Sequence, residues 1–306
     1  MSLRFYDAHN HLQDDRFSGR QAELMAACAR AGIARMVVNG ACEADWPQVL
    51  ALARQFPLMA RVETSNIQHP TSNAQQTREP GPLDVRCSMF DVRCSQILPS
   101  FGYHPWYLHE RTPDWQKNLV TFLDAVPSAV GEIGLDRWKP DLPYDGQEEV
   151  FIAQLRIAAE RNLPVSIHCL QAWGRMLEIL RSDPRPARGF LLHSYGGPKE
   201  LVKPFADLGA YFSFPGYYAH ERKERQRETF QHVPADRLLI ETDAPDQSLP
   251  DNLNQFPLTD SATGKPINHP ANLAAVYAFA AQLRSVSLEQ LAAQVEQNFL
   301  RLFGGL

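Results

Sequence analysis

The run Val130-Gly131-Glu132-Ile133-Gly134-Leu135-Asp136 places a carboxylate inside an apolar segment of β-strand composition. Four further apolar runs also end on a histidine or a carboxylate, namely Phe5–His11, Val165–His168, Phe190–His193 and Leu239–Asp243. In a barrel of parallel strands, the carboxyl ends of all the strands meet at one mouth, where the active site lies. The repeated pattern therefore predicts that these polar side chains converge at the mouth of such a barrel.

Strand-like and helix-like segments alternate along the whole chain. Eight strands are expected, at residues 3–7, 33–38, 96–101, 129–133, 165–168, 190–192, 210–214 and 238–242. Helical segments follow them at residues 19–31, 45–56, 112–125, 146–161, 172–180, 198–208, 220–232 and 271–284, with an additional helix at 288–302. Eight βα units predict an α/β fold, a (β/α)8 TIM barrel that residues 1–306 form as one domain.

The segment at approximately 63–95 does not fit this alternation, because it contains three prolines, is largely polar and shows no periodicity. It carries a tandem duplication, in which Asp84-Val85-Arg86-Cys87-Ser88 is repeated as Asp91-Val92-Arg93-Cys94-Ser95. We interpret it as an irregular insertion loop between the second βα unit and the third strand. An inserted element in the gene would explain the repeat, and a functional lid or substrate loop is the alternative.

Composition restricts the compartment and the partners. The 306 residues are 44% hydrophobic, which is enough for a large core, and the net charge of -5 provides no general attraction for nucleic acid. A polyanionic substrate would have to be bound locally, by metals and a few basic side chains. The chain begins without a signal-peptide pattern, has no apolar stretch near the roughly 20 residues that cross a bilayer, and has five cysteines without a CxxC pair. We therefore expect a cytoplasmic protein with no membrane contact and no obligate protein partner.

Two of the apolar runs carry residues suited to binding metal. His9 and His11 lie two residues apart at the end of the first strand, and alternate residues of an extended backbone share a face. Both imidazoles can therefore reach one ion. Glu132 would be buried, which is costly for a carboxylate unless it is paired or bound to metal. We favour a ligand that bridges two metals over a salt bridge to Arg137.

Three further strand ends supply candidate ligands. A single histidine at such a position is more often a hydrogen-bonded core residue, but His168 and His193 end consecutive strands and accompany the ligands above. Asp243 follows the eighth strand, where it could bind one metal and accept the proton of an attacking water. Glu241 precedes it by two residues and should support the ligands from the same face.

Eight motifs in order resemble one known family: Asp7–His11, Gly102–Pro105, Gly131–Asp136, Pro164–His168, Leu192–Tyr195, Phe212–Gly216, Glu241–Pro245 and Asn298–Gly304. The chain resembles the TatD family of metal-dependent deoxyribonucleases, within the amidohydrolase-like barrels. The likeness runs from Tyr6 to Phe303, apart from the insertion. It implies hydrolysis of phosphodiesters, often of DNA from its 3′ end.

The resemblance also implies a cofactor of two divalent metal ions, for which Zn, Mn and Mg are candidates. His9, His11 and Asp243 would hold the first ion, Glu132 would bridge to the second, and His168 and His193 would complete the second. The catalytic residues implied are Asp243, Glu132 and His104. Asp7, Asp136 and Glu241 would lie around the ligands or the substrate.

Two of these roles have alternatives. His104 would touch the substrate or the scissile phosphate, unless it only caps the segment that begins at Pro105. Asp136 would support a ligand, although a salt bridge with Arg137 is equally consistent with the sequence. Lys139 and Lys265 are basic loop residues that could also steady a phosphate.

One stretch departs from the family pattern. Many members have an Arg-Asn-Glu-Pro-like stretch before the helix that follows strand eight, whereas this chain reads Pro266-Ile267-Asn268-His269-Pro270. The arginine that would contact substrate or secure the loop is absent. This weakens the expectation of DNA binding more than that of the metal site.

Two other functions fit the same pattern. The first is hydrolysis of a small ester, lactone or amide on the same barrel, because barrels host many chemistries. Related amidohydrolases often carry a bridging lysine on strand four, and Glu132 occupies that place here. The second is a non-catalytic, metal-stabilised binding protein, although structural metal sites are usually closed and rich in cysteine. DNA or a small phosphoester is the substrate we expect.

Overall fold

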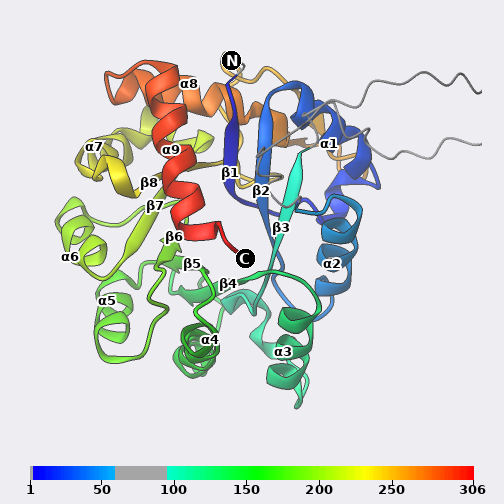
Figure 1. The fold of residues 1–306 in the computed structure, drawn as a ribbon, viewed down its shortest axis with the longest axis vertical. Helices are drawn as coiled ribbons and strands as arrows, with labels where there is room; N and C mark the ends of the chain where they lie inside the picture. The colour runs from blue at the N-terminus through cyan, green and yellow to red at the C-terminus, as the bar shows by residue number, and fades with distance from the viewer. Residues whose placement is uncertain (1–2, 59–94) are drawn as a thin grey trace, which may run out of the picture.

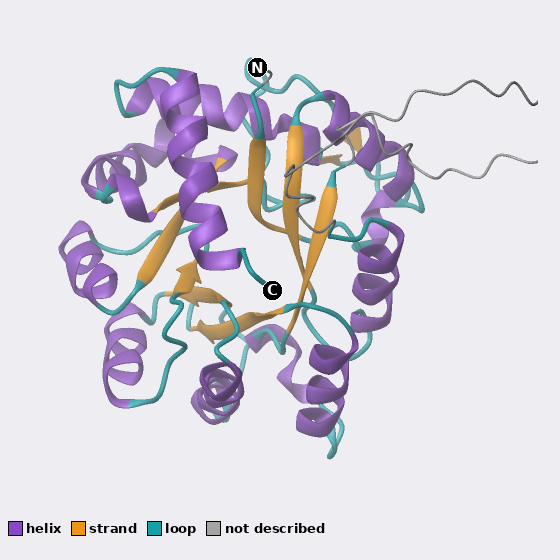
Figure 2. Ribbon diagram, in the orientation of Figure 1, coloured by secondary structure: helices purple, strands orange, loops and turns teal. Residues whose placement is uncertain are grey.

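The computed structural model describes residues 3–58 and 95–306. Its central sheet contains eight parallel strands in the order of the chain, which form the orange ring in Figure 2. They are β1 (Phe5–Asn10), β2 (Ile33–Asn39), β3 (Gln96–Phe101), β4 (Ala129–Asp136), β5 (Val165–Leu170), β6 (Phe190–Leu192), β7 (Ala210–Pro215) and β8 (Leu238–Glu241).

The ring closes between its first and last strands. The backbone N–H of Asp243 donates to the carbonyl of His9 at 3.0 Å, and that of His11 donates to the carbonyl of Ala244 at 2.8 Å. These bonds lie at the carboxyl ends of β1 and β8, so closure of the barrel also fixes the backbone of candidate metal ligands. The predicted (β/α)8 barrel is confirmed.

Helices surround this ring on the outside (Figure 1). They are α1 (Gln21–Arg30), α2 (Trp46–Gln55), α3 (Trp115–Ala125), α4 (Gln147–Arg161), α5 (Trp173–Ser182), α6 (Val202–Asp207), α7 (Glu224–His232) and α8 (Leu273–Leu283). Because helices cover the strands outside and side chains fill the barrel inside, the strands read as nearly continuous apolar runs. All eight residues of β4 are buried, for example. Among the described residues, no helix combines the length and the apolar character needed to cross a membrane.

The last helix, α9 (Leu288–Phe303), lies across the ring in the view of Figure 1. Ser287 begins it with a capping box, and Asn298 donates from its amide to the carbonyls of Ala235 and Leu238 at the start of β8, both at 2.8 Å. Phe299 packs on Tyr6, with ring centroids 4.9 Å apart. The helix therefore covers the amino-terminal mouth and leaves the carboxyl-terminal mouth for chemistry.

Several elements differ from the sequence predictions at their ends. The first strand continues to Asn10, so His9 lies within it rather than after it. Glu132 lies within the fourth strand, as predicted, and that strand continues to Asp136 rather than ending at 133. Their polar side chains are buried at the mouth, and the backbone continues in extended form beneath them. A 3-10 helix, η2 (Pro105–Glu110), and a short hairpin of β9 (Leu258–Thr259) and β10 (Pro266–Ile267) were not predicted.

The predicted insertion lies almost entirely outside the described residues, so its loop character stays a prediction. Its described flanks follow α2 and precede β3. Ser95 donates from its hydroxyl to the carbonyl of Ile33 at 2.6 Å, at the amino end of β2. The chain therefore re-enters the barrel at the end opposite to the strand ends that carry the candidate ligands.

Candidate metal centre

Glu132 lies at the middle of the carboxyl-terminal mouth, with 3% of its surface exposed. Histidine nitrogens from four strands or strand ends surround its carboxylate. Oε1 lies 2.8 Å from His193 Nε2, 3.1 Å from His168 Nδ1 and 3.3 Å from His104 Nε2, and Oε2 lies 3.3 Å from His11 Nε2 and 3.4 Å from His9 Nε2. A buried carboxylate in this setting is balanced by the groups around it rather than by water.

The two oxygens of Glu132 face two different groups of donors. On the Oε2 side, Asp243 Oδ1 lies 3.7 Å from His9 Nε2 and 3.6 Å from His11 Nε2. On the Oε1 side, His168 Nδ1 and His193 Nε2 lie 3.4 Å apart. The structure thus brings together all six side chains that the sequence predicts as ligands, in two groups that share one carboxylate.

In His11 and His168, the hydrogen bond at the outer ring nitrogen, the one farther from Glu132, determines which nitrogen carries the proton. The inner nitrogen then faces Glu132. His11 Nδ1 lies 2.8 Å from the carbonyl of Asn39, and His168 Nε2 lies 2.9 Å from Asp136 Oδ2. Both partners can only accept, so the outer nitrogen carries the proton in each neutral ring. The inner nitrogen then directs a lone pair at a carboxylate oxygen, which is repulsive unless a proton or a cation lies between. The residues therefore fit divalent cations held between histidine and Glu132.

His9 and His193 stack face to face, with ring centroids 4.0 Å apart. His9 Nδ1 lies 2.8 Å from Ser166 Oγ, which fixes the ring. His193 Nδ1 is buried without a hydrogen-bond partner, and its nearest carboxylate oxygen, Glu241 Oε1, lies 3.8 Å away. Glu241 accepts instead from the backbone N–H of Ser194 at 2.8 Å. It thereby holds the segment that carries His193.

His104 differs from the other four histidines. Its Nδ1 accepts the backbone N–H of Trp106 at 3.2 Å, so in the neutral ring the proton is on Nε2. That Nε2 faces Glu132 Oε1. His104 is thus the cap of η2, and its Nε2 also faces the centre; a contact with substrate stays a prediction.

The remaining predicted carboxylates lie farther out. Asp136 binds His168 rather than Arg137, and it accepts the indole N–H of Trp106 at 2.8 Å. Asp7 is fully buried and accepts the hydroxyl and the backbone N–H of Thr242. It joins β1 to the segment after β8 and is not among the residues that line the cavities described below.

Burial and mutual proximity shift the acidities at the centre. Burial lowers the pKa of His9 to about 3 and raises that of Asp243 to about 7. Burial also acts to lower the pKa of His11, but its bond to Glu132 outweighs this and raises the value to about 9. The pKa of Glu132 lies well below its usual range, because the nearby histidines outweigh the effect of burial.

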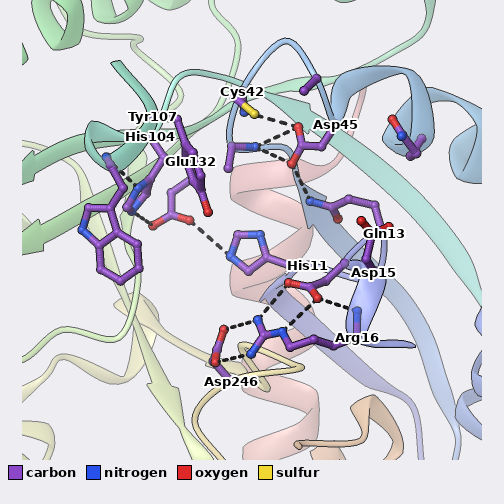
Figure 3. A pocket seen from close by; sticks show the side chains of 15 residues that line it. His11, Gln13, Asp15, Arg16, Cys42, Asp45, His104, Tyr107, Glu132 and Asp246 are labelled. Carbon is purple, nitrogen blue, oxygen red and sulfur yellow. Dashed lines mark hydrogen bonds and ion pairs between the residues drawn. The ribbon is translucent and has the colours of Figure 1, made fainter. Parts of the chain in front are cut away.

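Two cavities open beside the centre. The larger, of about 530 Å³, contains His11, His104 and Glu132 in its wall, and Figure 3 shows Glu132 between the two histidines. Four further side chains of this wall are acidic: Asp14, Asp15, Asp45 and Asp246. Arg16 is its one basic side chain besides histidine, and it is already bound to Asp14 and Asp246.

The smaller cavity, of about 240 Å³, reaches both groups of ligands and is also lined by Trp106 and Trp138. Neither lysine proposed from the sequence is in the wall of either cavity. The ammonium of Lys139 lies 4.6 Å from the ring centroid of Trp106, next to the smaller cavity. Lys265 immediately precedes β10.

Sequence reasoning missed the residues that orient the ligands. Asn39 ends β2 and so had the strand-end position that identified the ligands, whereas Ser166 is the second residue of β5 and did not. Gln247, which donates to Asp243 Oδ2 at 2.6 Å, had no such signal. In the loop that lacks the family arginine, Asn268 donates from its side chain to the carbonyl of Thr242 at 2.9 Å and so secures the loop.

The family profile described as TatD related DNase matches residues 88–304. The chain belongs to the TatD family. A curated relative, the 3′-5′ ssDNA/RNA exonuclease TatD of Citrobacter koseri, is 36% identical over 209 residues, which cover 66% of this chain and 76% of the relative. This confirms the family that the sequence motifs indicate.

A second TatD homologue matches over nearly the full length. The metal-dependent hydrolase YjjV of Escherichia coli K12 is 26% identical over 307 residues, which cover 99% of both chains. The crystal structure of YjjV superposes with a TM-score of 0.77 and covers 100% of both chains at 26% identity. Membership of this family confirms the prediction of a metal-dependent hydrolase.

Proposed function

We propose that the protein is a metal-dependent phosphodiesterase that removes nucleotides from the 3′ end of single-stranded DNA or RNA. The observation that carries the proposal is the buried Glu132 carboxylate, whose two oxygens face two separate groups of histidine donors at one barrel mouth. The 3′-5′ exonuclease activity for which the Citrobacter relative is named supports the direction and the substrate class. A location in the cytoplasm stays a prediction from the sequence.

Two divalent ions would be held there, by His9, His11, Asp243 and Glu132 on one side and by Glu132, His168 and His193 on the other. The mixture of imidazole and carboxylate suits Zn or Mn and, with fewer histidine contacts, Mg. Ions bound at such positions supply Lewis acidity, which lowers the pKa of water and offsets negative charge on a phosphate.

The chain's own groups would then move protons and orient the substrate. Asp243 would accept a proton from the attacking water, because Gln247 Nε2 donates to its Oδ2 at 2.6 Å and so fixes the carboxylate at the mouth. His104 can donate its Nε2 proton to a phosphate oxygen, since its Nδ1 is fixed by the backbone of Trp106. These fixed partners support the proposed catalytic roles of Asp243 and His104.

A small ester, lactone or amide is the second candidate substrate. The wall of the larger cavity favours it, since four aspartates face that space and its one arginine is already paired. A polyanion would be repelled there, whereas a neutral group would be tolerated.

The test uses metal-stripped protein with Mg, Mn and Zn returned separately, and single-stranded DNA labelled at its 5′ end. The proposal predicts a metal-dependent ladder of products shortened from the 3′ end, and no cleavage of a circular single strand. Cleavage of the circle would contradict the direction. Hydrolysis of small esters without any DNA cleavage would favour the second candidate.

A further inference from the structure

Trp138 is the most exposed large apolar side chain in the described part of the chain, with 56% of its surface accessible. Large aromatic side chains usually bury most of their surface, because their contact with water is unfavourable. Leu135, three residues earlier on β4, is fully buried. We therefore expect a bound ligand to cover the exposed indole of Trp138.

The indole lies beside the reacting centre rather than on a remote surface. Trp138 lines the 240 Å³ cavity together with Glu132, His168 and Asp243. A part of the substrate that contacts the indole would thus lie next to the bond that is hydrolysed at the candidate ligands.

The backbone that carries the indole is fixed by the centre itself. The N–H of Trp138 donates to Asp136 Oδ1 at 2.7 Å, while the other oxygen of Asp136 binds His168 Nε2 at 2.9 Å. The preceding N–H, of Arg137, donates to the carbonyl of Leu170 at 2.9 Å. Because the same carboxylate orients His168 and the segment at Trp138, the backbone at Trp138 is held in a fixed position relative to His168.

Charge distinguishes this side of the mouth from the other. Trp138 lies between Arg137 and Lys139 in the chain, and the ammonium of Lys139 lies 4.6 Å above the ring of Trp106. The wall of the larger cavity carries four aspartates, of which only Asp246 also lines the smaller cavity; the other carboxylates there, Glu132 and Asp243, are candidate metal ligands. A polyanionic strand would therefore approach over Trp138 and avoid the acidic wall.

We propose that Trp138 is a stacking platform for the base of a nucleotide that adjoins the scissile phosphodiester. Every base presents a π face, so one exposed indole binds single strands without selecting a sequence. The proposal deepens the function proposed above and rests on it. Trp138 is a specificity residue that favours substrates carrying a base over small esters that lack one.

The test compares Trp138→Ala, Trp138→Phe and wild type on single-stranded DNA whose last or penultimate nucleotide is abasic. Loss of one stacked base should lower kcat/KM by about 5- to 150-fold, mainly through KM. Wild type should show this loss on one of the two abasic strands relative to normal DNA. Trp138→Ala should show the same loss on normal DNA relative to wild type, and no further loss on that abasic strand. Trp138→Phe should recover much of the difference.

Val286→Ala serves as the control, because Val286 is also exposed, at 41%, and is not in the wall of either cavity. It should behave as wild type does. An undiminished preference for the normal strand in Trp138→Ala would overturn the inference while leaving the proposed function intact. Failure of wild type to shorten any DNA with any of the three metals would overturn the proposed function, and the inference with it.

Discussion

Asp136 orients a candidate metal ligand, His168, without being among the candidate ligands itself. Its carboxylate accepts from His168 Nε2 at 2.9 Å, so the Nδ1 lone pair of that ring faces Glu132. The same carboxylate holds Trp106 and the backbone of Trp138. Such supporting carboxylates fix the ring orientation and raise the basicity of the coordinating nitrogen.

We predict that Asp136→Asn weakens metal binding by about 10- to 100-fold, because the amide supports the required tautomer less strongly than the carboxylate. Titration of the metal-free variant with Zn or Mn, followed by calorimetry, measures the change. Asp124→Asn is the matched control, since Asp124 pairs with Arg161 on the surface, away from the centre. Equal affinities in Asp136→Asn and wild type would show that this bond does not govern the site.

At this scale the sequence predicted which side chains gather but not how they are oriented. The six candidate ligands stood out because each is a polar residue at the end of an apolar run. The partners of their outer nitrogens, such as Asn39 for His11 and Ser166 for His9, come from other strands. Those contacts depend on how the barrel closes, which no local pattern specifies.

The fourth and fifth strands approach so closely that only glycine fits at position 134. A Cβ placed on Gly134 would lie 1.9 Å from the carbonyl oxygen of His168, and its φ of +152° is rarely adopted by other residues. Gly134 on β4 is therefore required for packing, and this packing positions the candidate ligand His168 on β5.

We predict that Gly134→Ala destabilises the fold by about 1–3 kcal/mol, since β5 must move to relieve the overlap. The displacement of His168 should also lower metal content after dialysis. Gly174→Ala is the control, because a Cβ there meets nothing within 4 Å and the residue lies in α5. Urea denaturation that gives equal stability for Gly134→Ala and wild type would contradict the packing account.

Glu43 links the loop after β2 to the segments after β3. Its carboxylate accepts from the Tyr103 hydroxyl at 2.7 Å, from the backbone of Thr112 at 3.0 Å and from Asn118 Nδ2 at 2.6 Å. Burial acts to raise the pKa of Glu43, but these donors, Asn118 first, outweigh it and hold the pKa below the ordinary 4.5.

A pKa of Glu43 that is lower in the folded than in the unfolded state means that folding stabilises the charged carboxylate. The stabilisation is therefore present above about pH 4.5 and lost as the pH falls through the folded value. We predict that Glu43→Gln lowers the free energy of unfolding by about 1.5 kcal/mol at pH 7 and by much less at pH 3. Urea denaturation at both pH values, with Glu160→Gln as a surface control, measures this. A deficit that stays constant with pH would argue against a role for the charge.

For the molecule as a whole, the candidate ligands come from β1, β4, β5 and the ends of β6 and β8. Ions held among these residues would cross-link the strands that carry them. Asp243, after β8, and His9, on β1, also close the ring through a backbone hydrogen bond. Binding to the folded state alone stabilises a protein in proportion to the logarithm of ligand concentration.

We predict that removal of metal by a chelator lowers the free energy of unfolding by about 2.7 kcal/mol relative to protein at a free metal concentration of 100 times Kd. Scanning calorimetry, with metal returned in steps, gives the dependence. Glu132→Gln should lose most of this response, because its amide cannot balance the cations. Identical unfolding temperatures with and without metal would be inconsistent with a folded-state metal centre.

The alternation of apolar strands and helices was sufficient to predict the barrel, the order of its strands and the mouth that carries the site. It did not show that α9 covers the opposite mouth, because Asn298 and Phe299 contact β8 and β1 from far along the chain. It also did not show that the acidic wall of the larger cavity assembles from separate loops, since Asp14, Asp45 and Asp246 meet only in the fold.

Hydrolysis of 5′-labelled single-stranded DNA by wild type and Glu132→Gln, both supplied with Mn after metal removal, measures what the shared carboxylate contributes to the chemistry. If Glu132 joins two metal positions at which the phosphodiester is cleaved, wild type shortens the strand from its 3′ end and the variant loses nearly all of that activity. Equal rates for the two proteins would contradict the account, because they would show that the shared carboxylate does not contribute to the chemistry.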